Sequence, residues 1–264
     1  MADFVYRPRA GGGKDSYAFT WTTAQYWPVG GEELQFMAYS PVANTVTVKK
    51  NATDKKQLDI SLSDAAAGHT AMADVIVSTK DAADSGKDIK GHKEESAQTP
   101  TSINFHFTHI LSQLAVQVKG LHSNADAYIT KVEVKATHIA KTYDLTTSGW
   151  SGNADESGIT YTYNNGGNGW QLSTTAATTV NGETPILLFP GTQASTVATV
   201  YVKDGAAGQE TKLPAVTLSD VNSASLETGQ KTTLVITVEG VSIAGLTGSV
   251  TAWTDKGTYN ATIQ

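Results

Sequence analysis

The sequence predicts an all-β protein whose strands form antiparallel sheets. Apolar and polar residues alternate with period two through nearly every regular stretch, which is typical of half-buried strands. Clusters of Gly, Asn, Asp and Ser separate these stretches roughly every 8 to 15 residues, as in antiparallel sandwiches. No window of a dozen residues has a convincing helical period. We therefore expect little helix.

Eight stretches carry the alternation. In chain order they are residues 34–39, 44–48, 57–62, 103–107, 114–118, 129–134, 197–202 and 234–238. Two segments rich in Gly and charged or amide residues, 81–96 and 148–169, are predicted to be surface loops. Because the second resembles an inter-domain linker, we expect a domain boundary near Trp150. The predicted domains are residues 1–150 and 151–264.

Charge and composition exclude several classes of function. The 264 residues carry a net charge of −6, so no basic surface for gripping nucleic acid is expected. The absence of Cys removes thiolate catalysis, disulfides, zinc ribbons and iron–sulfur clusters. No apolar run is long enough to span a membrane, and the first residues lack the pattern of a signal peptide. Either the protein is cytosolic or a targeting segment precedes this sequence.

No constellation of catalytic or metal-binding residues stands out. His106 and His109 are three apart and face opposite sides of a strand, so structural roles are favoured over metal ligation. Asp74, Asp144 and Asp255 lie beside strand ends, where turn and cap roles are commoner than glycosidase chemistry. The nucleophile-elbow, phosphate-loop, zinc-protease and dinucleotide motifs are all missing. We predict neither a cofactor nor enzymatic activity.

Aromatic residues offer a different kind of site. Trp150 and Trp170, on either side of the Gly- and Asn-rich segment, could form a platform that stacks on sugars, although core packing is the commoner role of such rings. A monomeric, carbohydrate-binding surface protein is therefore an alternative function.

The arginines are confined to one place in the sequence. Arg7 and Arg9 are the only two, and they precede every Lys. An Arg-specific protease would therefore find targets only in the N-terminal segment. Pro8 hinders cleavage after Arg7, so the Arg9–Ala10 bond is the better target. The alternative is a tail that happens to hold two arginines.

Several short blocks occur in a characteristic order. YWP at residues 26–28 is followed by LQFMAYSP at 34–41, DVIV at 74–77, FHFTHILSQLAV at 105–116, KTYDL at 141–145, LLFPGTQ at 187–193 and VTAW at 250–253. The most specific block contains Phe105, Phe107, His109, Leu111 and Leu114. In order and spacing, the blocks resemble the fimbrillin-like (Mfa-like) family of Bacteroidales, the subunits of type V pili.

The resemblance implies two tandem transthyretin-like antiparallel β-sandwich domains. It also implies a non-catalytic subunit of a fimbrium, or pilus, that acts in cell adhesion at the cell surface. Such subunits begin as a lipoprotein precursor, whose signal peptide and lipidated Cys would precede this chain and link it to the cell outer membrane. The expected partners are other fimbrial subunits and a host or bacterial surface ligand.

Family members assemble by donor strand exchange, in which a protease removes an N-terminal strand and a neighbouring subunit fills the opened edge. On this sequence the resemblance places processing at Arg9, with Arg7 second, and the removed strand at Phe4, Val5 and Tyr6. Nine residues are short for a full strand, so a site further in, such as Lys14, is an alternative. The sequence after residue 253 holds at most one short strand as a donor, which favours a tip or accessory subunit over a shaft subunit.

Overall fold

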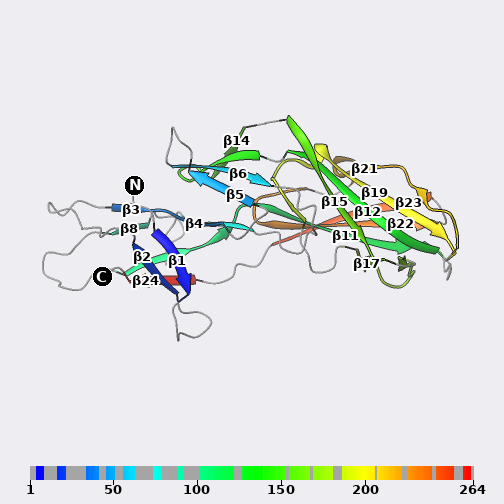
Figure 1. The fold of residues 1–264 in the computed structure, drawn as a ribbon, viewed down its shortest axis with the longest axis horizontal. Helices are drawn as coiled ribbons and strands as arrows, with labels where there is room; N and C mark the ends of the chain where they lie inside the picture. The colour runs from blue at the N-terminus through cyan, green and yellow to red at the C-terminus, as the bar shows by residue number, and fades with distance from the viewer. Residues whose placement is uncertain are drawn as a thin grey trace, which may run out of the picture.

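The computed structural model describes residues 4–8, 17–21, 34–41, 46–50, 56–62, 74–78, 89–91, 102–121, 127–138, 140–152, 155–166, 169–180, 186–205, 207–221, 225–239, 242–252 and 258–262. Over these residues the protein is nearly all β, as predicted. Helical structure in them is limited to two 3₁₀ turns, η2 (Gln193–Ser195) and η3 (Leu218–Asp220). The longest strands gather at one end of an elongated molecule (Figure 1).

A large sandwich is formed by two sheets. The five-stranded sheet contains β17 (Thr178–Thr179) and β18 (Ile186–Leu188), which pair with different parts of one edge of β11 (Ser112–Gly120), then β22 (Gln230–Glu239) and β23 (Ser242–Ala252). The six-stranded sheet contains β15 (Asp155–Asn164) and β16 (Trp170–Gln171) on β12 (Ala127–His138), then β19 (Thr196–Asp204) with β20 (Thr211–Lys212) and β21 (Val216–Thr217). Alternate residues of both sheets, such as Val116, Val134 and Ile236, share one buried core. The sheets therefore pack face to face.

One pair of strands in this sandwich is parallel. β11 runs alongside β22 with Val116 opposite Leu234, whereas every other described pair is antiparallel. A parallel pair needs a long crossover connection. Here the chain between β11 and β22 contains every strand of the opposite sheet, as well as β13, β14, β17 and β18, so the crossover includes the second layer of the sandwich.

A second core lies among smaller sheets. The four-stranded sheet has the order β14 (Gly149–Ser151), β13 (Ala140–Asp144), β6 (Gln57–Leu62), β5 (Val46–Lys50), and the three-stranded sheet has the order β10 (Thr108–His109), β7 (Val75–Ser78), β4 (Ala38–Pro41). Three two-stranded sheets pair β1 (Phe4–Pro8) with β2 (Tyr17–Trp21), β3 (Leu34–Phe36) with β8 (Ile89–Gly91), and β9 (Ser102–His106) with β24 (Thr258–Thr262). Leu58, Val77 and Tyr143 are among the buried residues of the second core.

Strand β18 joins the two cores. Ile186 and Leu188 pack in the sandwich core, whereas Leu187 and the following Phe189 pack in the second core. All four are fully buried because both faces of this short segment are covered. The hydroxyl of Tyr161, a sandwich residue, donates a hydrogen bond to the Leu187 carbonyl at 3.2 Å. The two cores are therefore continuous through β18.

Each of the eight predicted strands is present, but the prediction of a loop over residues 148–169 is wrong. This segment contains β14 and the ten-residue β15, whose Ile159, Tyr161 and Tyr163 are buried in the sandwich. The predicted loop at 81–96 also contains the short strand β8. The division into domains at 1–150 and 151–264, like the tandem arrangement, stays a prediction. Strands from both sides of Trp150, including β12 and β15, share one sheet.

Among the described residues there is no helix of the length and hydropathy needed to cross a bilayer.

Candidate functional site

The N-terminal strand β1 forms a hairpin with β2. Phe4 lies opposite Trp21 and Pro8 lies opposite Tyr17, so all five residues of the strand are paired. Among the described residues β1 has no other strand partner. The hairpin lies at the opposite end of the molecule from the long strands of the sandwich (Figure 1). One short strand thus covers one edge of β2.

The residues predicted for processing lie at the end of this strand. Arg7 is in β1, opposite Ala18, and is followed by Pro8, the last residue of the strand. Arg9 lies outside the described residues. Phe4, Val5 and Tyr6, the predicted removable strand, are all in β1. Their roles in processing and strand exchange stay predictions.

The block 105–116 connects the two cores, which explains its apolar pattern. Phe105 is buried, and Phe107 is half-buried with its ring centroid 6.1 Å from that of Phe105. Leu111 packs in the second core and Leu114 in the sandwich core. The block therefore carries the chain from one core to the other.

His109 is buried beside β7, and its predicted structural role stays a prediction. Its Nδ1 contacts the Asp74 carboxylate, and the other oxygen of that carboxylate accepts a hydrogen bond from the Val75 amide at 2.7 Å. The Ile110 amide donates to the Val75 carbonyl at 3.2 Å, so the pair lies where β10 and β7 meet. No group of His, Asp or Glu in the described part of the chain is arranged to hold a metal ion.

Replacing Asp74 with Ala is expected to lower the free energy of unfolding by about 2–3 kcal/mol, because it leaves a buried imidazole without its carboxylate partner. The Asp74→Asn variant keeps the size and one acceptor oxygen and should lose less. Urea unfolding of the intact chain measures both differences. Equal losses in the two variants would contradict this expectation and would show that the carboxylate charge, which both variants lack, accounts for the whole contribution of Asp74.

The predicted glycan platform residues both pack against the cores. Trp150 lies between Tyr143 and Phe189, with ring centroids 4.9 and 5.2 Å away in edge-to-face contacts. Its buried indole nitrogen has no hydrogen-bond partner among the described residues. Trp170 is half-buried against the sandwich core. Glycan binding by these rings stays a prediction, and their observed packing gives each a structural role.

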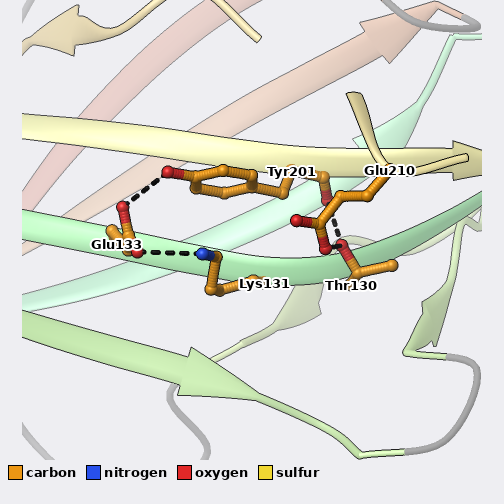
Figure 2. A network of polar contacts seen from close by, with 5 residues as sticks. All are labelled: Thr130, Lys131, Glu133, Tyr201 and Glu210. Atoms are coloured by element: carbon orange, nitrogen blue, oxygen red, sulfur yellow. Dashed lines mark hydrogen bonds and ion pairs between the residues drawn. The ribbon is translucent and has the colours of Figure 1, made fainter. Parts of the chain in front are cut away.

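A polar network covers the outer face of the six-stranded sheet (Figure 2). The Tyr201 hydroxyl donates to Glu133 Oε2 at 2.8 Å, and Lys131 Nζ lies 3.0 Å from Glu133 Oε1. Lys131 Nζ also lies 3.8 Å from the centroid of the Tyr201 ring, within the range of a cation–π contact. Thr130 Oγ1 is 2.6 Å from Glu210 Oε2. Side chains from β12 and β19 thus hold one another in place.

A bulge in β12 creates this arrangement. Ile129 pairs with Val202 and Lys131 pairs with Tyr201, so Thr130 is the extra residue between them. A bulge turns neighbouring side chains relative to a regular strand. The alternation of Lys131 and Glu133 is visible in the sequence. Their contact with Tyr201 was not predicted, because it depends on the pairing of β12 with β19, which places Lys131 opposite Tyr201.

Hydrogen bonds within the network raise the pKa of Lys131 and of Tyr201 and lower the pKa of Glu133. The bond to Glu133 raises the pKa of Lys131 and that of Tyr201. Partial burial opposes ionisation of Glu133, but the hydrogen bonds from Tyr201 and Lys131 outweigh it and lower its pKa. The network therefore holds Lys131 and Glu133 in their charged forms and Tyr201 in its neutral, hydrogen-bonded form on the outer face of the sheet.

The chain is similar to known proteins over most of its length. The fimbrillin-like family model matches residues 4–253. A fimbrial protein from Bacteroides vulgatus is similar in structure, with a TM-score of 0.61 and 14% identity over 92% of this chain and 83% of that chain. A candidate cell adhesion protein from Bacteroides uniformis has a TM-score of 0.53 and 19% identity, over 89% of this chain and 79% of that chain. No curated protein matches the sequence. Since the family model covers nearly the whole sequence, the chain belongs to the fimbrillin-like family.

Proposed function

We propose that this protein is a non-catalytic structural and adhesive subunit of cell-surface fimbriae. Its family membership supports this function, and so does its likeness in fold to a fimbrial protein. Its partners are other fimbrial subunits and a surface ligand, and its precursor carries a lipid anchor to the outer membrane.

The subunit assembles by protease-triggered strand exchange. The observation that carries this step is the pairing of β1, whose one described partner is β2. Cleavage after Arg9, or after Arg7, would release β1 and leave the backbone N–H and C=O groups on one edge of β2 unpaired. Such an edge accepts an extended strand from another chain, which supplies the missing backbone hydrogen bonds.

The subunit occupies a tip or accessory position more readily than the shaft. A shaft subunit must donate a strand as well as accept one. Strand β24 is paired along its five residues with β9 of its own chain, from Thr258 opposite His106 to Thr262 opposite Ser102. To be donated it would first have to leave that partner.

Limited digestion of the intact chain with an Arg-specific protease tests the proposed mechanism. Mass spectrometry is expected to show loss of residues 1–9, and the cleaved chain is expected to bind a labelled synthetic peptide with the sequence of residues 1–9. Fluorescence anisotropy measures this binding, with a scrambled peptide as the control. Oligomers that survive heating, seen by size-exclusion chromatography, would show that the chain also donates a strand.

The Arg7→Ala, Arg9→Ala double variant is the matched control. It should resist the protease, stay intact and bind no peptide, because its acceptor edge remains covered. Strand exchange is ruled out if the cleaved chain neither oligomerises nor binds the peptide while its β-sheet signal in circular dichroism is unchanged.

A further inference from the structure

Strand β23 ends the five-stranded sheet. It pairs with β22 from Gln230 opposite Ala252 to Glu239 opposite Ser242. No strand among the described residues pairs with its other side. An edge of this kind presents a row of backbone donors and acceptors to another chain.

The other lateral edges of the sandwich are short or charged. The opposite edge of the same sheet consists of β17 and β18, with two and three residues. In the six-stranded sheet one edge consists of β20 and β21, with two residues each, and the other consists of the two-residue β16 and of β15, whose charges are its first two residues, Asp155 and Glu156. Short strands and charges are the usual protection against edge-to-edge pairing. β23 has 11 residues, none of them charged and none of them Pro.

The side chains of β23 are self-complementary. Leu246, Gly248 and Val250 are half-buried and Leu246 packs against the sandwich core, whereas Thr247 and Ser249 are exposed. An antiparallel copy of the strand centred on Gly248 would place Leu246 opposite Val250 and Thr247 opposite Ser249. Apolar side chains would then meet on the core face and hydroxyls on the outer face, both favourable cross-strand pairs.

The bulge in β23 sets the length of this contact. Thr237 pairs with Gly245 and Val238 pairs with Ile243, so Ala244 is the extra residue. Bulges end regular pairing. Residues 245–251 lie beyond the bulge and are symmetric about Gly248, which leaves a seven-residue segment for a two-fold contact.

We propose that two copies of this protein associate through β23, as an antiparallel two-fold dimer that continues the five-stranded sheet across the interface. A second copy is the partner that the strand itself specifies, since a two-fold interface must be complementary to itself. The absence of charged residues from β23 matters because each chain carries a net charge of −6. An interface between two copies of β23 brings no like charges together. This lateral contact needs no proteolysis, so it is independent of the proposed strand exchange.

The intact, uncleaved chain is the material for the test. Sedimentation equilibrium is expected to show a monomer–dimer equilibrium. The Thr247→Lys, Ser249→Lys variant places Lys opposite Lys at two positions of this interface and should raise the dimer Kd at least about tenfold. Mixing it with a Thr247→Glu, Ser249→Glu variant should restore a dimer that contains one chain of each kind. Thr160→Lys, on the outer face of β15, is the matched control and should dimerise like the native chain.

A cross-linking experiment tests the register separately. Because the protein has no Cys, a Thr247→Cys chain mixed with a Ser249→Cys chain should form one disulfide-linked species under mild oxidation. A Thr160→Cys chain in place of either should not. The proposal is overturned if the native chain stays monomeric at about 100 μM, a concentration at which contacts of ordinary strength are populated. It is also overturned if the Lys variant dimerises as tightly as the native chain, or if the oppositely charged variants fail to pair.

Discussion

Replacing Phe189 with Ala is expected to lower the free energy of unfolding by about 3–5 kcal/mol, the range for truncating a buried aromatic residue. Phe189 is fully buried and its ring contacts Trp150 edge to face. It directly follows β18, whose alternate residues face the two cores. The cavity would therefore open where the cores meet, and relaxation of the surrounding side chains is limited because both faces of the segment are packed.

Urea unfolding of the intact chain, followed by circular dichroism, measures this loss. Leu121→Ala is the control, since Leu121 is 46% exposed and its truncation should change stability by less than about 0.5 kcal/mol. If Phe189→Ala also costs less than about 1 kcal/mol, the segment tolerates a cavity and does not join the cores as the packing implies.

The sequence predicted best those strands that have one buried face and one face toward solvent. β6, with its strict alternation of buried and half-buried residues, was predicted with the correct bounds. β15 has the same alternation at Ile159, Tyr161 and Tyr163, but Gly, Asn and Asp on both sides made the segment look like a loop. β18 is buried on both faces and so has no alternation to detect. A strand is therefore easiest to predict when one face is buried and the other faces solvent, because only then do apolar and polar residues alternate along it.

Contacts between distant strands could not be predicted in the same way. The parallel pairing of β11 with β22 joins residues more than 100 positions apart, and nothing local in either strand specifies a parallel partner. The open edge of β23 and the contact of Tyr201 with Glu133 follow from strand order in the two sheets. The arginines in and after β1 were selected as candidate processing sites from the sequence alone. This required no knowledge of strand pairing, because they are the only two arginines in the chain.

The second large effect is expected at Gly169, which lies against Ile129 and Thr130 at the bulge in β12. Replacing this residue with Ala is expected to lower the free energy of unfolding by about 3–5 kcal/mol, through backbone strain and a clash. Its φ of +89° is unfavourable for residues with a Cβ, and a Cβ at this position would lie 2.1 Å from the Ile129 carbonyl oxygen. The Ile129 carbonyl belongs to β12, and Gly169 directly precedes Trp170, which pairs with Ile129, so the clash cannot be relieved without separating β16 from β12.

Gly166 provides a control that separates the two causes. Its φ of +60° is also positive, but nothing lies within 4 Å of the position a Cβ would take. Gly166→Ala should therefore cost only the conformational term, about 1–2 kcal/mol. The two glycines belong to one turn, since the Gly169 amide donates to the Gly166 carbonyl at 3.0 Å, so local disorder would affect both variants alike. Unfolding in urea should show a gap of about 1–4 kcal/mol between them, with Gly169→Ala the less stable variant. Equal losses would mean that β16 moves aside freely, and that its pairing with Ile129 contributes little to the sandwich.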